Sequence, residues 1–135
     1  MFKNIHVFRI QPGVDIVEGI EHFCTSREIT SGIIIGIIGS VNSATLNYLK
    51  QLPGKYESHR YEGPLEIVCA QGSVALKNGE RILHIHIQLA SDKGCSGGHL
   101  VEAEVFSTAE VMIGELDFQL SRYLDKYTGL NELEG

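Results

Sequence analysis

Residues 64–90 have the sequence "PLEIVCAQGSVALKNGERILHIHIQLA". Two apolar segments, 64–76 and 81–90, stand on either side of the dipeptide Asn78-Gly79. Asn-Gly between two apolar segments is the strongest short-range indication of a β-hairpin. This stretch therefore predicts two antiparallel strands joined by a tight turn.

The chain before the hairpin begins with a strand and a helix. The segment 3–10 is rich in β-forming residues and stops at Gln-Pro-Gly, which predicts a first strand and a turn. Asp15, with Glu18 three positions on, resembles a capping box. Apolar residues then follow at helical spacing, so a helix is predicted over 15–27.

The remaining apolar segments predict further strands. Residues 31–39 are a β-branched run typical of a strand buried on both faces, and 43–51 predict a strand that ends at Leu-Pro-Gly-Lys. Residues 99–116 predict one or two strands, and the tail from Asp117 looks less regular. A strand, a helix and then many strands indicate an α+β fold, with a twisted, mostly antiparallel β-sheet and one main α-helix in a two-layer sandwich.

Composition limits the class of protein. The 135 residues suit one domain, 1–135, and 43% of them are hydrophobic, which is enough for a core. The three cysteines show no Cys-x-x-Cys spacing, so we expect reduced thiols rather than disulfides or a cysteine zinc finger. The N-terminus lacks a signal-peptide pattern, and the richest apolar stretch is shorter than the ~20 residues of a membrane helix. We therefore expect a soluble, cytoplasmic protein without membrane association.

The charge balance argues against direct DNA binding. The formal net charge is -6, with eleven basic residues scattered among seventeen acidic ones. Nucleic-acid binders usually carry a basic patch, because neutralising phosphates supplies most of their non-specific affinity. Direct DNA binding is therefore not expected.

Three of the six histidines lie close together in the sequence. Alternate residues of a strand share a face, so His84 and His86 should lie opposite the apolar residues between them. We expect the eight residues 91–98 to form a loop, with tight turning at its final two glycines, that returns the chain and places His99 beside the other two histidines.

Three imidazoles that meet around one ion, with a fourth position open, are a catalytic type of zinc arrangement. The pattern leaves a second interpretation open, in which His84 and His86 are only two polar residues on a solvated face. His6, His22 and His59 have no such partners and are interpreted as ordinary surface or half-buried residues.

Several segments together resemble a known family. They are "IHVFRIQPGVDIVEGI", "GIIGSVNSATL", "YEGPLEIVCAQGSVAL", "LHIHIQLA" and "GGHLVEAEVFSTAEVMIGEL". In this order, from about Ile5 to Leu116, they look like the PPC domain, the plants and prokaryotes conserved domain. The resemblance implies an α+β fold, a homotrimer, and a zinc-type site on His84, His86 and His99. The fold is also similar to a domain of acetolactate decarboxylase, a zinc enzyme that uses three histidines.

The segment "GIIGSVNS", residues 36–43, lacks the Gly-x-Gly-x-x-Gly order of a dinucleotide-binding loop. Because a strand is predicted after it, no helix N-terminus would receive a phosphate, and a tight turn with close backbone approach is expected instead. In the PPC family the matching segment lies near the histidines, which implies that Gly39, Ser40 and Asn42 line a pocket.

Three functions follow as hypotheses. The first is a homotrimeric binding or assembly module that carries a divalent metal, zinc by preference, with an unidentified small molecule as a further partner. The second is a small zinc-dependent lyase or hydrolase, in which Glu102 or Glu104 would act as acid or base. The third is association with DNA through a partner protein. Its only support is the plant members of the family, which carry an AT-hook, whereas this chain lacks one.

Overall fold

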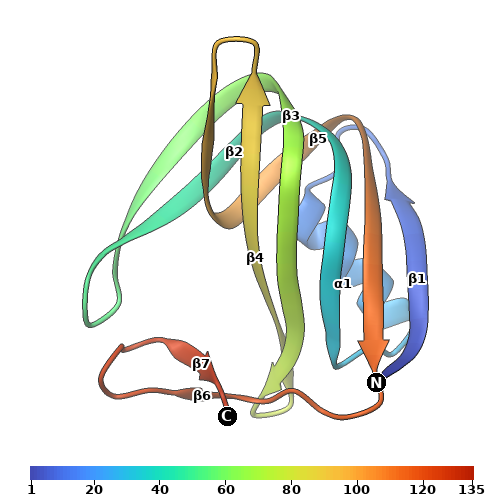
Figure 1. Cartoon of the computed structure of the whole chain (residues 1–135), viewed down its shortest axis with the longest axis vertical. Coiled ribbons are helices and arrows are strands. Elements are labelled where there is room, and N and C mark those ends of the chain that lie inside the picture. Colours follow the sequence, from blue (N-terminus) through green and yellow to red (C-terminus); the bar gives the residue numbers. More distant parts are fainter.

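A large curved β-sheet, one helix and a small two-stranded sheet make up the computed structural model, which describes all 135 residues (Figure 1). The elements are β1 (Phe2–Ile10), α1 (Ile16–Ser26), β2 (Gly32–Gln51), β3 (Lys55–Lys77), β4 (Glu80–Ser91), β5 (Gly94–Leu116), β6 (Arg122–Leu124) and β7 (Asn131–Leu133). The expected α+β fold, with a mostly antiparallel sheet and a single main helix, is confirmed.

The large sheet has the strand order β1-β5-β2-β3-β4, and β4 pairs a second time with β5. Every one of these pairings is antiparallel. The 23 residues of β5 allow it to pair with β4 near its start and with β2 and β1 farther along. Because β4 contacts both β3 and β5, the strands β5, β2, β3 and β4 form a closed ring. The short connection between β4 and β5 sets the start of β5 beside the end of β4, and this hairpin closes the ring.

The predicted hairpin is present as β3 and β4. Lys77 pairs with Glu80, and the turn between them consists of Asn78 and Gly79. Both turn residues have positive φ, 50° for Asn78 and 79° for Gly79. Asn-Gly suits this geometry because asparagine tolerates and glycine readily adopts the left-handed region.

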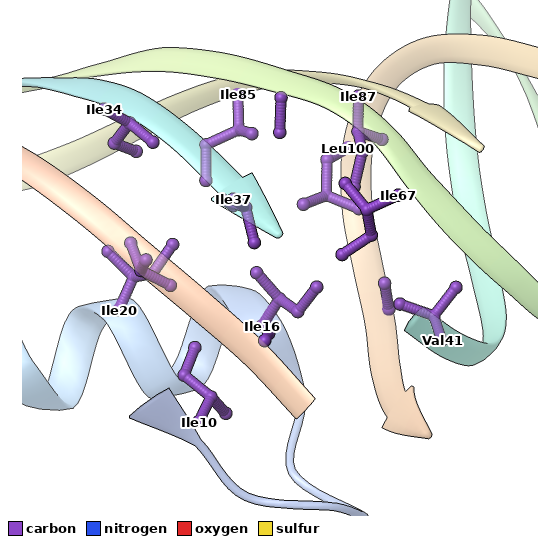
Figure 2. Close-up of a cluster of buried hydrophobic side chains, with 14 of the residues drawn as sticks. Ile10, Ile16, Ile20, Ile34, Ile37, Val41, Ile67, Ile85, Ile87 and Leu100 are labelled. Carbon is purple, nitrogen blue, oxygen red and sulfur yellow. The ribbon is translucent and has the colours of Figure 1, made fainter. Parts of the chain in front are cut away.

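Helix α1 covers one face of the sheet and matches the predicted helix to within one residue at each end. Oδ2 of Asp15 accepts the backbone N–H of Glu18 at 3.0 Å, so the N-terminal half of the expected capping box is formed. Ile16, Ile20 and Cys24 are fully buried against the sheet. No helix of the structure has the length and apolar character needed to cross a membrane. Figure 2 shows the two helix isoleucines in one cluster with strand residues Ile10, Ile34, Ile37, Val41, Ile67, Ile85, Ile87 and Leu100.

The alternation predicted for β4 is confirmed. Ile85, Ile87 and Leu89 are buried in the core, whereas His84 and His86 point to the opposite face. Burying these three aliphatic side chains contributes about 1.5–3 kcal/mol each. A slip of one residue would bury the histidines instead, so the hydrophobic alternation fixes the direction of both imidazoles.

The turn expected over 36–43 is wrong, because the two predicted strands, 31–39 and 43–51, are parts of one continuous strand, β2, which begins at Gly32. The register of β2 against its neighbours shifts on either side of Val41, and these irregularities let the long strand bend without leaving the sheet. The expected close backbone approach is present, since a Cβ at Gly39 would collide with the carbonyl oxygen of Thr108.

The eight-residue loop expected over 91–98 is also wrong. The turn consists of Asp92-Lys93 alone, and β5 begins at the next residue. Gly97 and Gly98, the two glycines expected to form a tight turn, instead lie within β5 and allow close packing against neighbouring strands. A Cβ at Gly98, for example, would lie 3.1 Å from the ring of Tyr48.

The tail is better ordered than its sequence indicated. We call residues 117–135 the C-terminal strap, which contains the small two-stranded sheet of β6 and β7. The backbone N–H of Leu76 donates to Leu120 at 3.0 Å, and that of Gly54 donates to Thr128 at 2.8 Å. In Figure 1 the strap passes the β3–β4 turn and continues towards the end of the molecule where β2 turns into β3.

Candidate metal site

Three imidazoles meet where β4 and β5 pair. His84 and His86 belong to β4, and His99 of β5 is the direct cross-strand partner of His86. The centroid of the His84 ring lies 5.1 Å from that of His86 and 5.0 Å from that of His99, and the last two are 5.6 Å apart. One nitrogen from each ring lies within 4.8 Å of the other two.

This spacing fits one metal ion. A tetrahedral ion about 2.1 Å from each imidazole nitrogen holds those nitrogens about 3.4 Å apart. Small side-chain rotations would bring the three rings to that distance, with no change in strand register. The residues present therefore fit a three-histidine site with an open fourth position.

The surroundings of His84 and His99 favour the neutral form of these two imidazoles. The pKa of His84 is lowered to about 4, mainly by burial and in smaller part by charge repulsion from His99, Arg122 and His86. Burial, with a smaller effect from His86, also lowers the pKa of His99. A neutral imidazole offers the lone pair that a metal requires, so two of the three rings are prepared for coordination at neutral pH.

Two pockets flank the histidines. The first measures about 270 Å³, and the second, about 400 Å³, lies along the β2 side. His84 and His99 line both pockets, whereas His86 lines only the second. The remaining residues of the first pocket are Tyr56, Ile82, Leu83, Arg122, Leu130, Asn131 and Glu132. Those of the second are Asn47, Tyr48, Leu49, Lys50, Tyr56, Gly98 and Leu130.

The strap supplies polar residues that sequence reasoning missed. Arg122 and Glu132 line the first pocket beside His84. Nη2 of Arg122 lies 3.5 Å from Nδ1 of His84, although the two residues are 38 positions apart. No motif marks either residue, and the tail carries too little periodicity to place it against the hairpin.

The other expected site residues lie elsewhere. Gly39, Ser40 and Asn42 line neither pocket at the histidines. Ser40 instead contacts Ser107 at 2.7 Å, and Asn42 donates to Glu104 at 3.0 Å. Asn47 is the β2 residue that pairs with His99. Gly39, Ser40 and Asn42 lie earlier along the same strand and therefore do not reach the histidines.

The two expected acid or base residues also lie outside both pockets. Glu102 accepts from Thr45 at 3.3 Å, and Glu104 accepts from Asn42 at 3.0 Å, so both belong to polar contacts between β2 and β5. Glu132 is the acidic residue that the fold brings to the histidine cluster.

Comparison with known proteins agrees with this architecture. Residues 1–117 match the Plants and Prokaryotes Conserved (PCC) domain, the family also called PPC. The chain belongs to this family. The PPC resemblance noted in the sequence is thereby confirmed, and the match ends at the first residue of the strap.

Two archaeal crystal structures share the PPC fold over the full length of this chain. A metal-containing protein from Archaeoglobus fulgidus is 31% identical, with a TM-score of 0.91 over 100% of this chain and 96% of that one. A PPC protein from Pyrococcus horikoshii is 29% identical, with a TM-score of 0.90 over 100% of this chain and 94% of its own.

Two further likenesses concern parts of larger proteins. A Staphylococcus aureus protein of unknown function, similar to α-acetolactate decarboxylase, shares the fold at 16% identity and a TM-score of 0.59, over 88% of this chain and 55% of its own. The bifunctional protein GlmU of a Synechococcus strain is 30% identical over 133 residues, which is 96% of this chain. The chain spans about one fifth of the length of this curated relative, 20%.

Proposed function

We propose that this PPC protein is a metal-binding module in which His84, His86 and His99 hold one divalent ion. The observation that carries the proposal is the meeting of three ligand nitrogens within 4.8 Å of one another. The relative from Archaeoglobus fulgidus, described as metal-containing, supports it. Zinc suits three imidazoles and an open fourth position better than calcium or magnesium, which prefer oxygen ligands.

The second candidate function is metal-dependent catalysis, as a lyase or hydrolase. It is favoured by the first pocket, where an acidic and a basic side chain lie beside the histidines. A zinc ion at this position supplies a Lewis acid that polarises a carbonyl or lowers the pKa of water. Glu132 replaces Glu102 and Glu104 as the candidate acid or base, because it alone of the three lines the pocket.

A homotrimer is the assembly that we propose for this module. An exposed apolar patch lies on the sheet face opposite α1 and consists of Ile5, Val7, Ile33, Ile35 and Ile38. Val7 is 70% exposed and Ile38 is 60% exposed, which is unusual for strand residues of a stable monomer. Covering the patch with two further copies agrees with the trimer implied by the family.

Elemental analysis and the mass in solution test both parts of the proposal. Protein purified without chelators and loaded with zinc is expected to retain about one ion per chain after gel filtration. Light scattering is expected to give three times the chain mass of 14.9 kDa. Protein that retains no ion after loading contradicts the metal site, and a monomer that persists at high concentration contradicts the trimer.

A further inference from the structure

Arg122 is a buried cation without a carboxylate partner. The residue is only 7% exposed, and no carboxylate oxygen lies within 4.0 Å of its guanidinium. Nη1 donates to the backbone oxygen of Asn131 at 2.9 Å, and Nη2 donates to Ser73 Oγ at 2.8 Å. Nε is buried and has no partner. Buried charges are normally paired, because leaving water costs several kcal/mol per ion.

A second arginine with little exposure shows the usual arrangement. The Arg81 side chain is 15% exposed, and its Nη1 pairs with Glu21 at 3.0 Å. The same nitrogen donates to Thr25, and Nε donates to the backbone oxygen of Ile29. Arg81 thus has a counter-charge within the protein, whereas Arg122 has only neutral partners. The missing counter-charge therefore sets Arg122 apart.

The place of Arg122 indicates where a counter-charge would bind. Arg122 lines the first pocket together with His84 and His99. A molecule bound in this pocket would therefore be close both to a metal held by the histidines and to the guanidinium of Arg122. Glu132 lies in the same wall but outside ion-pair distance of Arg122. A divalent ion on three neutral imidazoles would add two positive charges next to this unpaired cation. Such a site favours an anion.

We propose that the first pocket binds a small organic carboxylate, with one oxygen at the open metal position and the group paired with Arg122. This inference rests on the proposed metal site and adds the class of its ligand. The apolar side chains of Ile82, Leu83 and Leu130 line the rest of the pocket, which suits a short hydrocarbon body better than inorganic phosphate. A volume of about 270 Å³ limits the ligand to a small acid.

The proposed metal ligands and the proposed anion-binding residues belong to two different parts of the chain. The histidines lie within the PPC domain match of residues 1–117, whereas Arg122 and Leu130 belong to the strap beyond it. The domain would hold the metal, and the strap would select the anion. Changes in the strap should therefore alter anion affinity while leaving metal affinity almost unchanged.

Cobalt-loaded protein provides the test, because the visible absorption of Co²⁺ responds to a new ligand at an open position. Acetate, butyrate and inorganic phosphate are titrated at constant ionic strength and pH 7.5. Butyrate is expected to change the spectrum saturably and to bind more tightly than acetate or phosphate. Arg122→Gln should bind one Co²⁺ per chain with little change in affinity and lose at least tenfold in butyrate affinity. Arg81→Gln, the matched control, should keep both affinities.

Each result has a distinct meaning. Absence of cobalt uptake in wild-type protein overturns the metal site and the carboxylate proposal together. Cobalt uptake with no response to butyrate, or an equal response in Arg122→Gln, overturns only the carboxylate proposal. Phosphate binding as tight as that of butyrate overturns the assignment to an organic acid. Circular dichroism checks folding, and if Arg122→Gln does not fold, Arg122→Lys replaces it. This variant keeps the charge but not the planar fork, so at least a threefold loss is expected and wild-type affinity overturns the proposal.

Discussion

His86 is the most exposed of the three clustered histidines, and its side chain lies opposite the core residues Ile85 and Ile87. Its removal should therefore cost the fold little while it takes one ligand from the metal. His84, by contrast, is partly buried and contacts the strap. The two neighbours on one strand thus allow metal binding and structure to be examined separately.

We predict that His86→Ala loses most of its bound metal and keeps its fold. Loss of a ligand should lower zinc affinity by at least about a hundredfold, since changes beside the ligands already cost about 10–100-fold. Metal-free stability should change by less than about 0.5–1 kcal/mol, as for other exposed residues. Competition with a chromophoric chelator measures the affinity. His59→Ala is the control, because His59 is exposed and pairs with Glu57 instead. If His86→Ala still binds one zinc ion per chain tightly, the three histidines do not form the metal site and are only polar residues on a strand face.

The low pKa of His84 predicts a pH dependence of the metal-free protein. In the folded chain the pKa is about 4, against an ordinary value of about 6.5. Between these values the unfolded chain binds a proton that the folded chain excludes, so stability is full above about 6.5 and falls as pH drops towards 4. The loss attributable to His84 should be on the order of 2–3 kcal/mol, which is less than the full shift would give, because the ring is only partly buried and solvent screens its interactions. Urea unfolding across this range measures it, and His84→Gln should flatten the dependence. An unchanged slope in that variant would contradict the assignment.

At the scale of elements, two glycines of β2 differ in how closely the neighbouring strand β5 approaches them. Gly36 and Gly39 both lie in β2, but their surroundings differ. A Cβ at Gly36 would lie 3.3 Å from the flexible end of Met112, whereas a Cβ at Gly39 would collide with the backbone of Thr108. A side-chain end can rotate away, but a paired strand backbone cannot move without breaking hydrogen bonds.

We predict that Gly39→Ala destabilises the protein by at least about 2 kcal/mol, because β5 must shift to make room. Gly36→Ala should stay within about 1 kcal/mol of the wild type, since Met112 can adapt. Chemical denaturation of the two variants gives the comparison. Equal stability of the two would show that Thr108 does not confine Gly39 in solution.

For the whole molecule, the apolar patch on the open sheet face predicts self-association. Ile38→Lys places a charge where a neighbouring copy would pack, so the trimer should dissociate to monomer at micromolar concentration. The monomer should remain folded, because Ile38 is 60% exposed and outside the core. Light scattering with circular dichroism tests this. Leu124→Lys, which alters a residue of similar exposure on the strap, should leave the assembly intact. A trimer that tolerates Ile38→Lys would place its interface elsewhere.

The net charge of -6 predicts that the isolated protein does not bind duplex DNA at physiological salt. An acidic chain releases few counterions from the phosphate backbone, and that release supplies most non-specific affinity. Fluorescence anisotropy with a labelled duplex should show no binding up to tens of micromolar protein. Micromolar affinity with a steep salt dependence would overturn this expectation and show a basic face on the assembled protein.

Local patterns in the sequence determined the β3–β4 hairpin, the helix and the face on which His84 and His86 lie. Each of these features depends on residues that are close together in the sequence. Asn-Gly favours a tight turn, and the alternation of aliphatic residues determines which face of β4 is buried. The PPC resemblance also came from the sequence, through motifs in order. The resemblance also implied that Gly39, Ser40 and Asn42 line the pocket at the histidines, but none of them lines either pocket there.

The sequence predicted that His99 returns beside the other two histidines, but only the tertiary structure decided the register of that approach and brought Arg122 and Glu132 to the site. The pairing of His86 with His99 depends on the two-residue turn and on the register of β5, which glycines such as Gly98 permit by close packing. The approach of Arg122 to His84 depends on where the strap docks on the hairpin. The strap contact forms only when the tail folds back over the closed sheet. No local pattern encodes this docking, because its energy comes from surfaces that exist only after the sheet has formed.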